Sequence, residues 1–156
     1  MAPYVAVIGA SRATAEQQAL AEAVGAGLGR AGAVVVCGGG PGVMEAASRG
    51  AASAGATVVG ILPGEDRAHA NRWVSVAIAT GMGELRNGLV IRACDCAIAV
   101  GGAYGTLSEI ALALAQGVPV IGLQTWDIGG IELAPDPDTA VARALALAGE
   151  RRAPRP

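Results

Sequence analysis

The segment from Cys96 to Ala115 constrains the fold of this chain more than any other, because an apolar stretch there runs through a glycine turn into a helical pattern. Residues 96–100 predict a buried strand, and residues 106–115 predict an apolar helix. The turn between them contains Gly101, Gly102 and Gly105. Such a turn directs backbone N–H groups and the positive end of the helix dipole at one point. The segment therefore predicts a site for a phosphate or another oxyanion.

Strand and helix patterns alternate along the whole chain of 156 residues. Alternation of this kind predicts an α/β fold, a Rossmann-like three-layer sandwich with a mostly parallel, doubly wound sheet. We expect a single domain over residues 1–148 and a flexible tail over 149–156. The predicted strands cover residues 4–8, 34–37, 57–62, 74–78, 96–100 and 118–123, and the predicted helices cover residues 14–30, 41–53, 84–93, 106–115 and 138–148.

Three glycine turns follow predicted strands, at residues 9–11, 38–40 and 101–105. The carboxyl ends of parallel strands meet at one edge of a sheet, where ligands bind near the topological switch point. We therefore expect the three turns to converge on one small phosphorylated ligand of nucleotide size. The candidate binding residues on these turns are Gly9, Ser11, Gly39, Gly40, Gly101, Gly102, Gly105 and Thr106.

Composition excludes several other classes of function. The net charge is −2 and no basic stripe precedes the last residues, so nucleic-acid binding is not expected. The apolar runs are too short for a membrane span, and no signal-peptide pattern is present, which predicts a cytoplasmic protein. Cys37, Cys94 and Cys96 fit a reducing compartment, and without a second Cys/His pair they predict no metal site. No resident cofactor is expected, and His69, the one histidine, is expected at the surface.

Residues 101–109 resemble the signature PGGxGTxxE of the LOG (Lonely guy) family, also known as lysine decarboxylase-like proteins. Residues 38–44 and 9–11 resemble the other glycine turns of that family. The resemblance implies a Rossmann-like homodimer that hydrolyses the N-glycosidic bond of nucleoside 5′-monophosphates to a free base and ribose 5-phosphate. The chain is most similar to a short bacterial branch near the molybdenum-cofactor carrier proteins.

Two catalytic residues are implied by this resemblance. Glu109 matches the final glutamate of the signature. Arg86 corresponds to the arginine of a second family motif, MHxRK, but here no histidine or following lysine is present and Met82 is one residue too far from the arginine. The chain departs from the pattern at Val100, where the family has proline, and at Ser108, where many members have a first glutamate. Two functions therefore stay open. One is a phosphoribohydrolase, and the other is a non-catalytic carrier or sensor of a nucleotide or a molybdenum-cofactor-like phosphate ligand.

Each candidate also has a purely structural interpretation. Thr106 and Glu109 have the spacing of a capping box, in which the glutamate bonds back to the helix start rather than facing a ligand. Arg86 is alternatively a solvated charge on its helix. The apolar helices at residues 89–93 and 110–115 are expected to pack against a second subunit.

Overall fold

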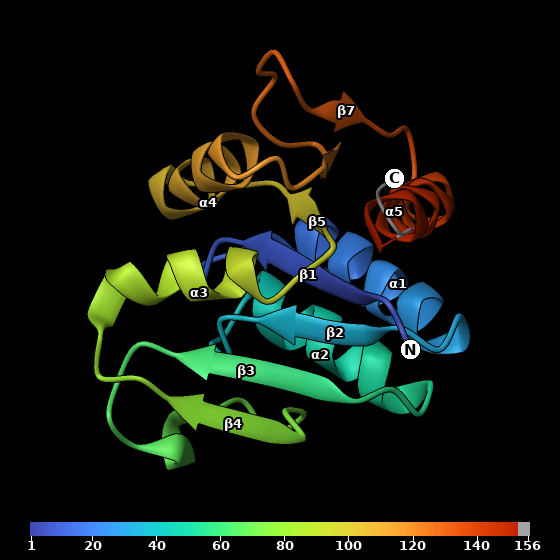
Figure 1. The fold of residues 1–156 in the computed structure, drawn as a ribbon. Helices are drawn as coiled ribbons and strands as arrows, with labels where there is room; N and C mark the ends of the chain where they lie inside the picture. Colours follow the sequence, from blue (N-terminus) through green and yellow to red (C-terminus); the bar gives the residue numbers. More distant parts are fainter. Residues whose placement is uncertain (153–156) are drawn as a thin grey trace.

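A computed structural model describes residues 1–152 of the chain (Figure 1). Strands and helices alternate as the sequence predicts. The elements are β1 (Tyr4–Gly9), α1 (Ala15–Arg30), β2 (Val34–Cys37), α2 (Val43–Ser53), β3 (Val58–Leu62), η1 (Arg67–His69), β4 (Val76–Ala79), η2 (Gly83–Arg86), α3 (Asn87–Arg92), β5 (Cys96–Val100), α4 (Tyr104–Ala115), β6 (Val120–Leu123), β7 (Glu132–Leu133) and α5 (Pro137–Arg152).

The strands form one seven-stranded sheet in the order β4-β3-β2-β1-β5-β6-β7, and every neighbouring pair is parallel. From β1 the chain builds outward on one side to β4, then returns to place β5 on the other side of β1. Val5 pairs with Cys96 and Gly9 with Val100 across this junction. The predicted doubly wound sheet is confirmed, and its switch point lies between β1 and β5.

Helices cover both faces of the sheet. Figure 1 shows α1, α2 and α5 on one face and α3 and α4 on the other. Alternate residues of β1 enter the two resulting cores, with Val5 and Val7 on the α1 side and Ala6 and Ile8 on the α3 side. A strand buried on both faces needs apolar residues at successive positions, which is the pattern of this strand. The predicted three-layer sandwich is confirmed.

Close contact between α1 and α2 explains glycines that are unfavourable inside a helix. A Cβ atom added to Gly25 would lie 2.0 Å from the carbonyl oxygen of Ala47, and one added to Gly50 would lie 2.0 Å from that of Glu22. Any side chain at these two positions would therefore push the helices apart.

The observed elements correct the sequence prediction at several places. The helix predicted over residues 84–93 is a 3₁₀ turn, η2, followed by the shorter α3. The two-residue strand β7 was not predicted. Helix α5 continues to Arg152, beyond the predicted helix end at residue 148, and residues 153–156 of the predicted tail lie outside the described part of the chain. No helix within residues 1–152 combines the length and the hydropathy that crossing a bilayer requires.

All three cysteines are buried thiols. Burial raises the pKa of Cys94 and of Cys96 to about 12, so both stay protonated at neutral pH. Burial also raises the pKa of Cys37. Within residues 1–152, no group of three His, Cys, Asp or Glu side chains is placed to hold a metal ion. The cysteines act as small packing residues in this structure.

Candidate ligand-binding site

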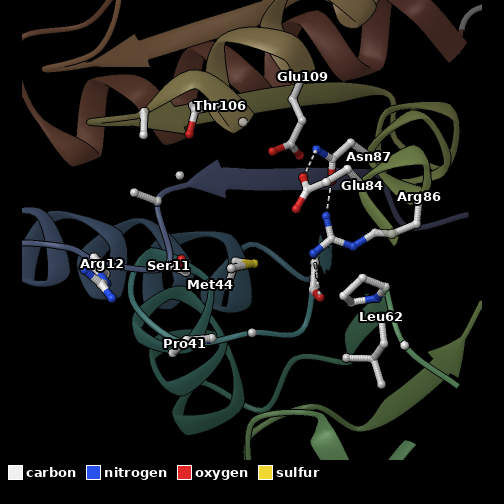
Figure 2. Close-up of a pocket in the computed structure, with 18 of the residues that line it drawn as sticks. Ser11, Arg12, Pro41, Met44, Leu62, Glu84, Arg86, Asn87, Thr106 and Glu109 are labelled. Atoms are coloured by element: carbon white, nitrogen blue, oxygen red, sulfur yellow. Dashed lines mark hydrogen bonds between the residues drawn. The ribbon is translucent and has the colours of Figure 1, made fainter. Parts of the chain in front are cut away.

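A pocket of about 780 Å³ lies at the carboxyl edge of the sheet, over the β1–β5 switch point (Figure 2). Segments that follow β1, β2, β3, β4 and β5 all contribute to its wall. The three predicted glycine turns therefore do converge on one cavity. Its volume suits a ligand the size of a nucleotide.

One end of the pocket, here called the loop end, is formed by Ser11, Arg12, Pro41 and Thr106 (Figure 2). Thr106 is only 2% exposed, and its hydroxyl oxygen has no hydrogen-bond partner within the described residues. It lies in the first turn of α4, whose backbone N–H groups have no partners within the helix. The neighbouring Gly105 also lines the pocket, and a Cβ atom there would meet nothing within 4 Å. The loop end thus has open space beside unused hydrogen-bond donors.

The opposite end, here called the acidic end, is formed by Glu84, Arg86, Asn87 and Glu109 (Figure 2). The Asn87 side-chain amide donates a hydrogen bond to Glu84 Oε2 at 3.4 Å. The Arg86 guanidinium donates to Asn87 Oδ1, and at 3.4 Å to the backbone oxygen of Gly38. A Cβ atom on Gly38 would lie 2.6 Å from Arg86 Nη2, so only glycine lets this guanidinium lie against the β2 turn. These bonds fix η2 and the start of α3 across the pocket from α4.

Glu109 is the one acid of this end that belongs to α4. It is 8% exposed, and within residues 1–152 its carboxylate makes no hydrogen bond or ion pair that meets the usual distance limits. Burial raises its pKa from an ordinary value of 4.5 to about 7, and Glu84 adds to the rise while Arg86 opposes it. Glu109 is therefore divided between its acid and its carboxylate forms near neutral pH.

The structure decides between the two interpretations of Thr106 and Glu109. The N-cap of α4 is Ala103, so Thr106 lies inside the helix and the pair is not a capping box. Their spacing of three residues instead places both side chains on one helical face, and that face lines the pocket.

Most of the predicted site residues line the pocket, namely Gly9, Ser11, Gly40, Arg86, Gly105, Thr106 and Glu109. Gly39, Gly101 and Gly102 do not line it. They form part of the turns without lining the pocket. Gly39 has φ +75° and Gly101 has φ +56°, backbone conformations that favour glycine.

Sequence reasoning missed other residues of the wall, above all Glu84 and Asn87, with Arg12, Pro41 and Met44. One signal could have found Glu84 and Asn87. Both lie in the segment that follows a predicted parallel strand. Such a segment is expected at the same sheet edge as the glycine turns.

The structure also places His69 and Tyr104. His69 is exposed, as predicted, and lies at the edge of the pocket. Tyr104 is 82% exposed and stacks on Trp126, with ring centroids 6.2 Å apart, rather than lining the pocket.

The surface expected to meet a second subunit is only partly apolar. Leu85 of η2 is 78% exposed, and Leu89 of α3 and Leu112 of α4 are also exposed. Ile110 and Ala113, however, face the core and are fully buried. The homodimer stays a prediction.

A parallel Rossmann-like sheet with a pocket at its carboxyl edge defines a small-ligand-binding protein. The chain belongs to the SLOG cluster4 family, whose profile matches residues 2–146. It is 41% identical to an uncharacterized protein of Archaeoglobus fulgidus. The match extends over 138 residues, which are 88% of this chain and 91% of that relative.

Two solved structures share the fold over nearly their whole length. One is the molybdenum cofactor binding protein of the phototrophic bacterium Rippkaea orientalis, with a TM-score of 0.89 and 32% identity over 94% of this chain and 98% of that one. The other is the molybdenum cofactor carrier protein MCP of Chlamydomonas reinhardtii, with a TM-score of 0.85 and 30% identity. This match covers 96% of this chain and 99% of the carrier protein. The predicted resemblance to a LOG-like branch near these carriers is confirmed.

Proposed function

We propose that this protein binds a phosphorylated heterocyclic ligand, a nucleotide or a molybdenum-cofactor-type pterin, and carries it without chemical change. The observation that carries the proposal is the buried, unpartnered Thr106 hydroxyl at the start of α4, beside the open space over Gly105. A buried hydroxyl without a partner is unfavourable, and a rotation of the Thr106 side chain toward a phosphate at the start of α4 would give it an acceptor. The similarity to molybdenum cofactor binding and carrier proteins supports the carrier role.

The loop end suits a phosphate in three respects. The first turn of α4 offers backbone N–H groups and the positive end of a helix dipole. The Thr106 hydroxyl offers one further donor. Arg12 supplies a positive charge at the side of the pocket. The molybdenum cofactor carries its phosphate on a pterin derivative, so the same end of the pocket would hold either ligand.

Filling the phosphate space should abolish phosphate-dependent binding. We expect Gly105→Val to weaken binding of GMP by roughly tenfold or more, because the new side chain occupies the space beside the helix N-terminus. Guanosine, which lacks the phosphate, should bind wild type about as weakly as GMP binds the variant. Isothermal titration calorimetry measures both affinities. Protein purified from a molybdenum-cofactor-producing bacterium, assayed for oxidised pterin by fluorescence, tests the cofactor directly.

The matched control is Gly88→Val. Gly88 is the second residue of α3, as Gly105 is of α4, and a Cβ atom there also meets nothing within 4 Å, but Gly88 does not line the pocket. This control should keep wild-type affinity. Equal binding of GMP and guanosine by wild type, with no pterin in the purified protein, would overturn the proposal.

A second candidate function is hydrolysis of nucleoside 5′-monophosphates, favoured by the two carboxyl groups of the acidic end. Water would add across the bond between C1′ of the ribose and the base nitrogen, and the base would leave with a proton. Glu109, with its pKa raised to about 7, suits the acid that protonates the leaving base. Glu84 suits the carboxylate that stabilises the ribosyl cation.

Base release distinguishes the two functions. A hydrolase should release free base from AMP or GMP, and Glu109→Ala should lower the rate by about 100-fold or more while ligand binding persists. Chromatography of the incubated nucleotides gives the rate. A wild-type protein that binds GMP and releases no base is a carrier, and the hydrolase candidate is then wrong.

A further inference from the structure

The two ends of the pocket offer opposite kinds of hydrogen-bonding groups. The loop end presents donors, which are the α4 N–H groups and the Thr106 hydroxyl. The acidic end holds two carboxylates against one arginine, so it is rich in acceptors. Figure 2 shows Ser11 and Arg12 on one side of the pocket and Glu84, Arg86 and Glu109 on the other. A ligand that satisfies both ends has an anion at one extremity and N–H donors at the other.

Glu109 is the acceptor that the protein itself leaves unused. Glu84 accepts a hydrogen bond from Asn87, and Asn87 in turn accepts from Arg86. Glu109 is 92% buried, being 8% exposed, lines the pocket and has no such bond within the described residues. Its carboxylate points into the open pocket (Figure 2), so a ligand with N–H donors at this point would supply the hydrogen bonds that the described residues do not.

We propose that the acidic end recognises the 2-amino-4-oxopyrimidine ring that guanine and pterins share, through two N–H groups of that ring and the Glu109 carboxylate. This inference rests on the proposed function and names the class of heterocycle that the phosphorylated ligand carries. The ring presents an N–H and an adjacent NH₂ side by side, which match the two oxygens of one carboxylate as a guanidinium does. Its neighbouring carbonyl oxygen needs a donor, and Arg86 has N–H groups beyond those that Asn87 and Gly38 accept.

Related bases lack this arrangement. Hypoxanthine has the ring N–H and the carbonyl oxygen but no 2-amino group, so one oxygen of Glu109 would stay without a donor. Adenine has an unprotonated ring nitrogen in place of the N–H, which would face the carboxylate with a lone pair. A site that accepts hydrogen bonds from N–H groups of its ligand rejects analogues that lack those groups. This rejection is far stronger than that of a site which recognises shape alone.

The test compares GMP, IMP and AMP by isothermal titration calorimetry at pH 8. We expect wild type to bind GMP roughly tenfold or more tightly than IMP or AMP, because each analogue leaves the buried carboxylate short of a donor. In Glu109→Gln the three affinities should fall within about threefold of one another, with AMP binding itself little changed. Displacement of GMP by 6-hydroxymethylpterin, compared with displacement by guanosine, tells which of the two sources of the ring fits better.

The control variant is Glu65→Gln, which removes the same charge from an exposed loop at the same sheet edge without touching the pocket. It should keep the wild-type preference for GMP. Equal affinity for GMP and IMP, with both still dependent on the 5′-phosphate, would overturn this inference and leave the proposed function standing. The same holds if Glu109→Gln keeps the preference. Failure of every phosphorylated compound to bind would overturn both.

Discussion

Glu109→Gln should make the protein more stable at pH 8, by up to roughly 3 kcal/mol, and leave its stability nearly unchanged at pH 4. Burial raises the pKa of Glu109 from 4.5 to about 7, against the opposing charge of Arg86 and with the help of Glu84. The stability that the neutral acid contributes is fully present below pH 4.5 and is lost as the pH rises through 7. Glutamine resembles the neutral acid at every pH, so it removes this loss.

Urea unfolding of both proteins at pH 4, 6 and 8 measures the difference. The exposed Glu65 provides the control, because Glu65→Gln should change the free energy of unfolding by only about 0.5 kcal/mol at any of these pH values. A variant that is less stable than wild type at pH 8 would show that Glu109 has a structural partner. The expected gain in the free energy of unfolding would show that Glu109 lowers the stability of the protein. Ligand-binding residues commonly have this effect.

Gly25→Ala should destabilise the protein by about 3 kcal/mol, although alanine is the better helix former. The new methyl group would lie 2.0 Å from the carbonyl oxygen of Ala47, and backbone atoms of α2 cannot move aside as a flexible side chain can. The helices would have to separate, which opens the core beneath them. Thermal or urea unfolding gives the value.

Gly149→Ala is the matched control for this prediction. Gly149 is also a helical glycine, in α5, but a Cβ atom there meets nothing within 4 Å. Alanine at this position should raise stability by up to about 1 kcal/mol, the difference in helix propensity. If Gly25→Ala and Gly149→Ala shifted stability in the same direction, the close contact of α1 and α2 would not be what requires glycine.

The sequence predicts the sheet and the glycine turns because their signals are local. Residues 4–8 and 96–100 are continuous apolar runs that end in glycine, and such runs fit only a strand covered on both faces. Thr14 and Gln17 form the capping box that their spacing predicts. Once the strands are parallel, the convergence of the turns follows from topology alone.

The acidic end of the pocket could not be predicted from local sequence patterns. Whether Arg86 reaches the pocket depends on η2 crossing to Gly38, and that contact joins residues far apart in the sequence. The Thr106 to Glu109 spacing fits both a cap and an interior helical face, and only the start of α4 at Tyr104 separates them. Strand β7 is two residues long and owes its conformation to pairing with β6 rather than to its own side chains.

The central position of β1 has a consequence for how the protein folds as it is synthesised. β1 is synthesised well before its partner β5, which is complete only at Val100. Pairings between such distant residues form slowly, because a long loop must close before they contribute stability. A ligand that touches Ser11 after β1 and Thr106 after β5 would hold both sides of this junction together. Ligand binding should therefore slow unfolding. A ribosome-bound chain that ends before α4 lacks Thr106 and should not bind the ligand.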